Sequence, residues 1–150
     1  MILRINKEPS LDDDCVDVHY RELTPAIKQI LSICKEGTQM LRAEQNGKVF
    51  NIDTNDIFYI EWIDNRSCIC ASKEIYSTPQ TLSQLDQLLD SKSFVRVSKP
   101  MIVNVYKVKW VSSGFNMKLS AELINGERIE ISRHYRDQLL DAIYGLGKEK

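Results

Sequence analysis

The sequence contains no long hydrophobic run, few cysteines and histidines, and no excess of charge of either sign. Of its 150 residues, four are cysteine and two are histidine, and 20 basic side chains stand against 21 acidic ones, for a formal net charge of −1. Mostly apolar stretches such as residues 101–105 are about a quarter of the roughly 20 residues that a membrane-spanning helix needs. Residues 1–9 lack the apolar core and the cleavage site of a secretory signal. We therefore expect a cytoplasmic protein, and the net charge by itself indicates neither a nucleic-acid nor a membrane partner.

Residues typical of catalytic or metal sites are too few and too scattered to form a known motif. The sequence has no GxSxG, HExxH or GxGxxG motif and no CxxC pair. Cys68 and Cys70 alternate along one strand, which favours two small buried hydrophobes over a redox pair. His19 and His134 stand alone, and the three aspartates at residues 12–14 lack the later ligands of a calcium loop. We expect no enzyme, no cofactor, no metal site and no small-molecule substrate.

Residues 1–37 are predicted to form a small β-β-α unit of their own, able to pack on the rest or to dimerise. Apolar and polar residues alternate at 3–5 and again at 16–20, which predicts two short strands. A helix is expected over residues 25–35. The residues typical of its ends are Thr24 as N-cap, Pro25 at the first position and Gly37 as C-cap. Its apolar stripe consists of Leu23, Ile27, Ile30, Leu31 and Cys34.

From residue 38 to 145 the hydrophobic period changes to two, which predicts a mostly β (α+β) domain followed by a frayed tail at 146–150. Asn46-Gly47 and Asn125-Gly126 each tolerate two positive φ values and mark tight hairpins. The strands expected around these turns are 40–45 with 48–53, and 118–124 with 127–132. Further strands are expected at 56–62, 67–71 and 74–77, and two more within 94–111, joined near 104–107. Short helices are expected after Thr78-Pro79, with Leu82, Leu85, Leu88 and Leu89 on one face, and from Tyr135 to Tyr144, ending at Gly145.

Positive charge is concentrated in residues 91–121. This stretch has six basic residues and no acidic one: Lys92, Arg96, Lys99, Lys107, Lys109 and Lys118. A strand-rich segment of this kind suits contacts with phosphate, Lys107 and Lys109 included. The alternative is a sheet edge that lysines protect against aggregation.

Several blocks of the sequence together resemble the LytTR-type DNA-binding domain of bacterial transcription regulators. The blocks, in the family's order and spacing, are residues 56–61, Leu82 with Leu85, 94–104, 125–126 and 131–135. The resemblance covers about residues 40 to 145 and implies a fold of stacked small antiparallel sheets with short helices. Residues 1–37 are too few for the receiver domain that often precedes such domains, so the resemblance is to the small stand-alone members.

The resemblance implies that loops between strands enter two successive major grooves of duplex DNA and bend it. Arg133 can donate two hydrogen bonds to guanine O6 and N7, and Lys99 can reach a guanine edge or a phosphate. Carried over by position, the remaining contact residues are Ser67 or its neighbour Arg66, with Asn65 and Ser98. Implied partners are double-stranded DNA and a second copy on repeated half-sites, and some stand-alone members are controlled by a membrane protein.

Each basic residue also has an ordinary structural interpretation. Arg133 could cap or ion-pair with the final helix, Lys99 could be plain surface charge, and Arg96 could be a structural partner of Glu61. The sequence also departs from the family pattern. The departures are Ser67 and Ser98, where many members have His, Pro100, where they have Ser, and Met101, where they have an aromatic residue. These departures keep open a rival function, a protein-interaction module or antagonist that has the fold without DNA binding.

Overall fold

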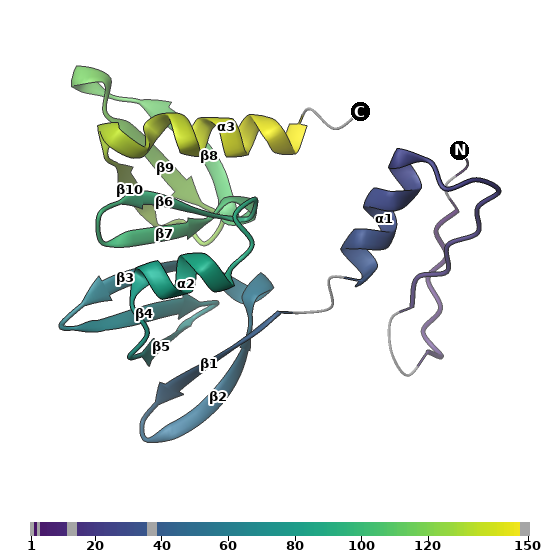
Figure 1. Ribbon diagram of the computed structural model, residues 1–150, viewed down its shortest axis with the longest axis horizontal. Helices are drawn as coiled ribbons and strands as arrows, with labels where there is room; N and C mark the ends of the chain where they lie inside the picture. Colours follow the sequence, from purple (N-terminus) through teal and green to yellow (C-terminus); the bar gives the residue numbers. More distant parts are fainter. Residues whose placement is uncertain (1, 3, 12–14, 36–38, 148–150) are drawn as a thin grey trace. The chain divides into compact units, whose positions relative to one another are not determined.

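The computed structural model describes residues 2, 4–11, 15–35 and 39–147, and divides the chain into two compact units, Met1–Gly37 and Thr38–Lys150 (Figure 1). Within these described ranges, no helix is long and apolar enough to cross a membrane. Cys15, Cys68 and Cys70 carry free thiols. Cys70 is buried in the sheet and Cys68 is half-buried.

The first unit contains the predicted helix, α1 (Pro25–Lys35). Thr24 caps it as expected, because its Oγ1 accepts from the N–H of Ile27 at 3.3 Å and its C=O accepts from the N–H of Lys28 at 2.9 Å. Ile27, in the apolar stripe, is 9% exposed. The expected C-cap, Gly37, lies outside the described residues.

The two strands predicted ahead of α1 are wrong for the part of the segment that the structure describes. Residues 2, 4–11 and 15–24 include no strand, and Ile5 and Val16 are 82% and 71% exposed. An alternation of apolar and polar residues over three to five positions does not predict a strand unless an apolar layer covers its hydrophobic side. An isolated two-stranded ribbon is only marginally stable in water. The described part of the first unit is therefore a helix preceded by irregular chain.

In its described residues, 39–147, the second unit consists of two antiparallel sheets and two helices. The large sheet has seven strands in the order β2-β1-β5-β4-β3-β7-β6, and the small sheet has three in the order β10-β9-β8. The strands of the large sheet are β1 (Met40–Gln45), β2 (Lys48–Asp53), β3 (Ile57–Ile63), β4 (Arg66–Ala71), β5 (Glu74–Thr78), β6 (Phe94–Ser98) and β7 (Met101–Asn104). The small sheet has β8 (Val108–Ser113), β9 (Leu119–Leu123) and β10 (Arg128–Ile131). The helices are α2 (Leu82–Leu88) and α3 (Arg136–Gly147), with short 3-10 turns η1 (Thr54–Asp56), η2 (Val105–Lys107), η3 (Phe115–Met117) and η4 (Arg133–Tyr135).

Both predicted hairpins are confirmed, but their turns differ. Asn46 (φ 52°) and Gly47 (φ 75°) both adopt positive φ, as a two-residue turn requires. In the second hairpin only Gly126 does, at φ 89°, and its N–H donates to the C=O of Leu123 at 2.9 Å. That connection is a type I turn closed by a glycine bulge, because one extra residue separates the paired strands.

Three boundaries between residues 78 and 147 differ from the prediction. The first helix begins at Leu82, after a capping box in which Thr81 and Gln84 exchange hydrogen bonds, and Thr78 ends β5 instead. Residues 94–111 hold three strands, because Lys99-Pro100 forms a hairpin turn between β6 and β7. The last helix runs past Gly145 to Gly147, and residues 148–150 lie outside the described part. Leu88, predicted on the apolar face of α2, is 50% exposed.

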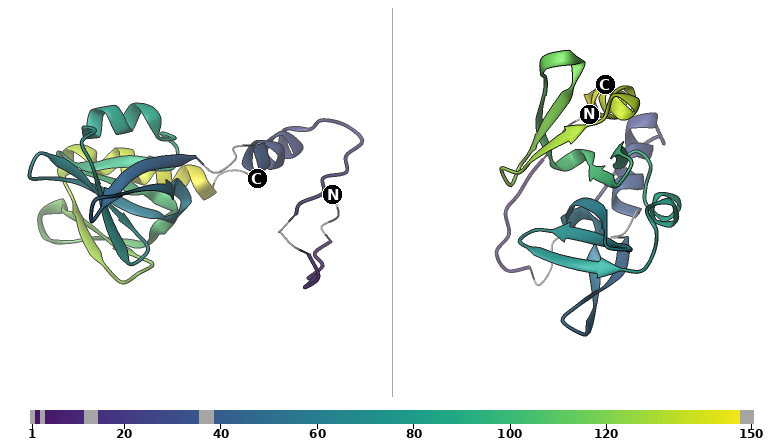
Figure 2. Two further views of the ribbon diagram at one scale, coloured as in Figure 1. Left: turned by 90° about the horizontal axis from the view of Figure 1, so that it is seen from below. Right: turned by 90° about the vertical axis from the view of Figure 1, so that its left-hand side faces the viewer.

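Two apolar cores lie on opposite faces of β3, β6 and β7. One lies under α2 and includes Ile60, Leu85 and Ile102; the other lies under the small sheet and α3 and includes Val97 and Leu139. Figure 2 shows α2 on one side of the large sheet and the small sheet on the other. Because alternate residues of β6 enter the two cores, both layers fix this strand and the turn that follows it.

Candidate nucleic-acid interface

Connections from distant parts of the sequence meet at one rim of the second unit because main-chain hydrogen bonds join their strands. The N–H of Trp62, near the end of β3, donates to the C=O of Pro100 in the β6–β7 turn at 2.8 Å. The N–H of Ser132, just before η4, donates to the C=O of Val97 in β6 at 2.8 Å. We call the following set the loop rim: the 64–66 turn, the 98–100 turn, the 114–118 loop and residues 132–133. Figure 1 shows these connections along the left edge of the second unit.

The 64–66 turn is a tight hairpin that directs Asn65 and Arg66 outward. Asp64 and Asn65 both have positive φ (50° and 62°) and connect β3 to β4, where Ile63 pairs with Arg66. Asn65 and Arg66 are exposed, and Arg66 Nη1 donates to the Oγ of Ser77 at 3.4 Å. These two predicted contact residues therefore lie on the rim.

Ser67, in contrast, does not face solvent. It is fully buried (0% exposed), and its hydroxyl donates to the C=O of Gln80 at 2.6 Å. Side chains alternate along β4, so the residue after the exposed Arg66 faces the core. The structure thus places the predicted contact residue Ser67 in the core, and the alternative position, Arg66, is the one that faces solvent.

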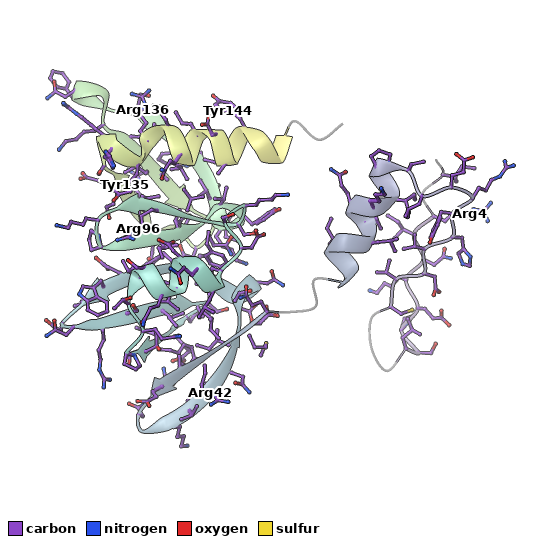
Figure 3. All side chains as sticks on the ribbon, in the orientation of Figure 1. Arg4, Arg42, Arg96, Tyr135, Arg136 and Tyr144 are labelled. Carbon is purple, nitrogen blue, oxygen red and sulfur yellow. The ribbon has the colours of Figure 1, made fainter. Side chains whose placement is uncertain are left out.

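The 98–100 turn is braced from below by Arg96. One guanidinium nitrogen of Arg96 lies 3.2 Å from Asp86 Oδ2 on α2, and the other donates to the C=O of Lys99. Figure 3 shows Arg96 between α2 and the β6–β7 hairpin. Lys99 is exposed and Ser98 is half-buried at its register position opposite Met101. The hydrogen bond from Arg96 thus fixes the main-chain carbonyl of Lys99, whereas the Lys99 side chain is exposed to solvent.

Glu61, the structural partner that the sequence left open for Arg96, is not its partner in this structure, and the sheet register explains why. Arg96 pairs with Ile102, which points into the core under α2. Glu61 pairs with Met101, one position along, which points into the other core. Neighbouring positions on a strand face opposite sides of the sheet, so Arg96 meets a carboxylate of α2 instead.

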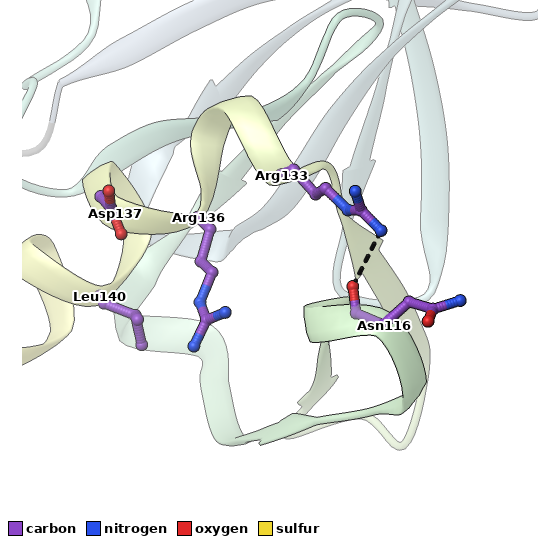
Figure 4. Close-up of a pocket in the computed structure, with 5 residues that line it drawn as sticks. All are labelled: Asn116, Arg133, Arg136, Asp137 and Leu140. Carbon is purple, nitrogen blue, oxygen red and sulfur yellow. Dashed lines mark hydrogen bonds between the residues drawn. The ribbon is translucent and has the colours of Figure 1, made fainter.

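Arg133 is exposed, and its partner in the structure is the 114–118 loop. Arg133 Nη2 donates to the C=O of Asn116 at 3.0 Å, and Asn116 has a left-handed φ of 59°. Figure 4 shows this bond at the edge of a surface pocket of about 650 Å³. The pocket is lined by Asn116, Arg133, Arg136, Asp137 and Leu140. Arg133 thus joins η4 to the β8–β9 connection, a role the sequence did not suggest.

Lys107 and Lys109 do not belong to the loop rim. Strand β7 begins at the rim with Met101 and ends at Asn104, so η2 and its Lys107 lie at the opposite end of the sheet. The ammonium of Lys107 lies 5.2 Å from the centre of the Phe58 ring, a cation–π contact. Lys109 follows on β8, close to the same end. The structure therefore separates these two lysines from Lys99.

The rim is positively charged even though the whole chain is not. Its four segments contain Arg66, Lys99, Lys118 and Arg133, against one carboxylate, Asp64. Both Lys118 and Arg133 are exposed. Positive charge at the tips of loops, where solvent access is greatest, favours a polyanion as the ligand. Among the described residues, no group of three or more His, Cys, Asp or Glu could hold a metal ion.

Two features of the site were not singled out from the sequence, the support of the 98–100 turn by Asp86 on α2 and the 114–118 loop of the rim. Asp86 is ten residues from Arg96, and only the packing of α2 brings the two together. The 114–118 loop does carry a signal, because Gly114 and Asn116 are residue types that mark turns. These turn residues by themselves do not indicate that the loop contacts Arg133.

Comparison with known proteins shows which family has this arrangement. Residues 47–143 match the family model of the LytTr DNA-binding domain. The chain is 27% identical over 88 residues to the sensory transduction protein LytT of Bacillus cereus, covering 59% of this chain and 36% of that protein. It is 23% identical over 125 residues to LytT of Bacillus subtilis, covering 83% of this chain and 52% of that protein. The chain thus spans about a third to a half of these relatives.

A solved structure agrees with the fold described above. The LytTr DNA-binding domain of a Bacillus cereus response regulator superposes with a TM-score of 0.66 and 21% sequence identity, covering 73% of this chain and 99% of that one. The match with the family model extends over more than half of the chain and includes all four rim segments in full. The chain belongs to the LytTR family of DNA-binding domains.

Proposed function

We propose that this protein is a cytoplasmic bacterial regulator of transcription that binds specific duplex DNA through its loop rim. Family membership supports DNA as the ligand class. The observation that carries the proposal is the hydrogen bond between Ser132 and Val97, which keeps the segments of Arg133 and Lys99 together on one rim. Had these residues been on opposite faces, no single duplex could contact both.

The order of the rim segments suggests how the duplex is read. The 98–100 turn lies between the 64–66 turn on one side and residues 132–133 on the other, as the bonds of Pro100 and Val97 show. We assign the two outer segments to successive major grooves, where Arg133 donates to a guanine and Arg66 with Asn65 contacts the second groove. Lys99 and Ser98 then face the sugar-phosphate backbone between the grooves.

This arrangement favours bent DNA. The outer rim segments are separated by strands β3, β7 and β6, which at about 4.8 Å per step span roughly 15 Å. Successive major grooves on one face of straight duplex are about 34 Å apart. Long side chains cover only part of this difference. We therefore propose that the duplex bends toward the rim, at an elastic cost that the added contacts offset.

Two copies on repeated half-sites would double the contacts. The stripe of α1 supports this, because Ile30 and Leu31 are only half-buried and Leu23 is 50% exposed. Light scattering of the full chain, alone and with a duplex carrying one or two half-sites, measures the stoichiometry. One copy on a two-site duplex would contradict this part of the proposal.

The decisive experiment is selection of bound duplexes from a random pool at two salt concentrations. A specific regulator enriches a short sequence motif that persists at the higher salt, because base contacts depend less on salt than phosphate contacts do. If no sequence is enriched at either salt concentration, the result favours the rival function, a protein-interaction module that keeps the fold without DNA binding. Gel mobility of circularly permuted duplexes with the selected site then reports the bend.

A further inference from the structure

Phe115 is the most exposed large hydrophobic side chain in the described part of the chain, at 91%. It lies at the tip of the β8–β9 connection, in the 114–118 loop of the rim. Single exposed apolar residues are common on protein surfaces and need no explanation by themselves. An aromatic ring that is almost fully exposed to water nevertheless has a large apolar area, and a partner that buried this area would gain binding free energy.

The loop that carries Phe115 is held in one conformation. The N–H of Gly114 donates to the C=O of Lys118 at 2.6 Å, which closes the loop at its base. Asn116 adopts a left-handed φ of 59°, and its C=O accepts from Arg133 Nη2 at 3.0 Å. The main chain on the C-terminal side of Phe115 is therefore fixed to the residue that we assign to guanine. A ring presented on a fixed loop pays little conformational entropy when it binds.

We propose that Phe115 is an additional DNA-contacting residue, whose ring packs on the C5-methyl group of a thymine in the major groove that Arg133 enters. The inference rests on the proposed function and extends it to a residue and a base. Thymine alone presents a methyl group in the major groove, and phenylalanine is one of the side chains that contact it. The ligand class follows from the neighbours of the ring, because Lys118 and Arg133 are exposed cations that suit a polyanion.

Arg133 retains enough donors for both roles. A guanidinium has five N–H groups in a fixed fork, and the bond to Asn116 uses one of them. The others remain for O6 and N7 of guanine. The same side chain can thus hold the loop and read a base, so that Phe115 and Arg133 together select a guanine with a thymine nearby.

The test uses the full chain and the duplex recovered from the random pool. Each thymine of that duplex is replaced in turn by uracil, which removes only the methyl group. We expect wild-type binding to weaken about fourfold at one thymine near the guanine read by Arg133, the value for loss of one buried methyl group. Phe115→Ala should weaken binding to the unmodified duplex by at least that factor and should not respond to uracil at that position. Phe115→Leu should retain part of the response.

Controls separate this contact from effects on folding. Because Phe115 is exposed, its variants should unfold at the same temperature as the wild type. Ile124→Ala is the matched control, since Ile124 is also exposed (56%) but lies at the opposite end, where its N–H donates to the C=O of Lys107. It should bind the selected duplex as the wild type does.

Several results would overturn the inference. Equal losses of Phe115→Ala on selected and random duplexes would exclude base recognition. If Phe115→Ala binds more weakly but the affinity of the wild type does not change with uracil at any position, the ring contacts DNA elsewhere, for instance as a wedge between base pairs. Wild-type affinity in Phe115→Ala would remove the contact altogether. In these cases the wild type still binds DNA and the proposed function stands, whereas a wild type that selects no duplex refutes both.

Discussion

Arg96 Nη1 and Asp86 Oδ2 lie 3.2 Å apart and join β6 to α2 beneath the 98–100 turn. The second arm of the same guanidinium donates to the C=O of Lys99. Arg96 Nε is buried and has no hydrogen-bond partner in the described structure, so the two outer arms account for the position of the group. A short helix thus supports a rim segment from inside the fold, although it does not reach the rim itself.

Arg96→Ala should weaken binding to a selected duplex more than binding to a random one. Without the guanidinium the Lys99 carbonyl loses its donor, and the turn no longer holds Lys99 and Ser98 in one geometry. We expect about a tenfold loss, roughly 1.4 kcal/mol, for the selected duplex and less than about twofold for random duplex. Fluorescence anisotropy with both duplexes measures the difference.

The controls for Arg96 use an arginine of similar chemistry elsewhere. Arg128→Ala removes the exposed ion pair with Glu122, whose atoms lie 3.5 Å apart, at a strand outside the rim, and should leave both affinities unchanged. Arg96→Lys keeps the charge but cannot bridge Asp86 and the Lys99 carbonyl together, so it should resemble alanine. Wild-type affinity of Arg96→Lys for the selected duplex would show that the positive charge, and not the bridge between Asp86 and the Lys99 carbonyl, supports binding.

Arg133→Ala should remove preference for one base pair. A bidentate contact with guanine contributes about 1–3 kcal/mol of discrimination, which corresponds to a loss of roughly 5- to 150-fold on the selected duplex. Competition between the selected duplex and single-base variants of it should show a flattened profile at one position. Equal losses on every sequence would mean that Arg133 contacts phosphate or only holds Asn116.

Much of the fold could be predicted because its signals are local. Asn46-Gly47 and the strands around it are determined by backbone preference and a period of two, and the structure has both strands at the predicted bounds. Thr24 and the start of α1 likewise depend on a few adjacent residues. The strands expected before α1 failed because a short alternation is informative only when an apolar layer exists to cover it.

The site was harder to predict because rim and core alternate within one strand. A slip of one position separates Arg66, which is exposed, from Ser67, which is buried. The charge density of residues 91–121 placed Lys99 and Lys107 in one group, whereas β7 carries them to opposite ends of the sheet. Such separations depend on the path of the chain through the fold, which cannot be predicted from local charge composition.

Lys99→Ala and Lys107→Ala should differ in their effect on salt dependence. Each phosphate contact adds about 0.9 to the slope of log affinity against log salt concentration, so Lys99→Ala should lower this slope by about one unit. Lys107 lies over Phe58 away from the rim, and its replacement should leave the slope unchanged. A titration of affinity over several salt concentrations compares the two, and a lower slope for Lys107→Ala would extend the interface to η2.

Ser67→Ala should reduce stability without changing the sequence preference. The hydroxyl of Ser67 is buried and donates to the C=O of Gln80 at 2.6 Å, so its loss leaves that carbonyl without its donor. The expected cost is about 1–3 kcal/mol in the free energy of unfolding, measured by urea titration. Unchanged stability with altered base preference would return Ser67 to the interface.

Tyr59→Phe should alter how stability depends on pH in the alkaline range. Burial, with a contribution from the nearby Glu127 carboxylate, raises the pKa of Tyr59 above its usual value of 10.0. The folded protein therefore holds this proton at pH values where the unfolded chain has lost it, and stability falls as pH rises above about 10. Phenylalanine has no proton to lose, so the free energy of unfolding of the variant should decline less steeply than that of the wild type. Glu127→Gln should give an intermediate slope, and parallel curves for wild type and Tyr59→Phe between about pH 9 and 11 would show that Tyr59 titrates alike in both states.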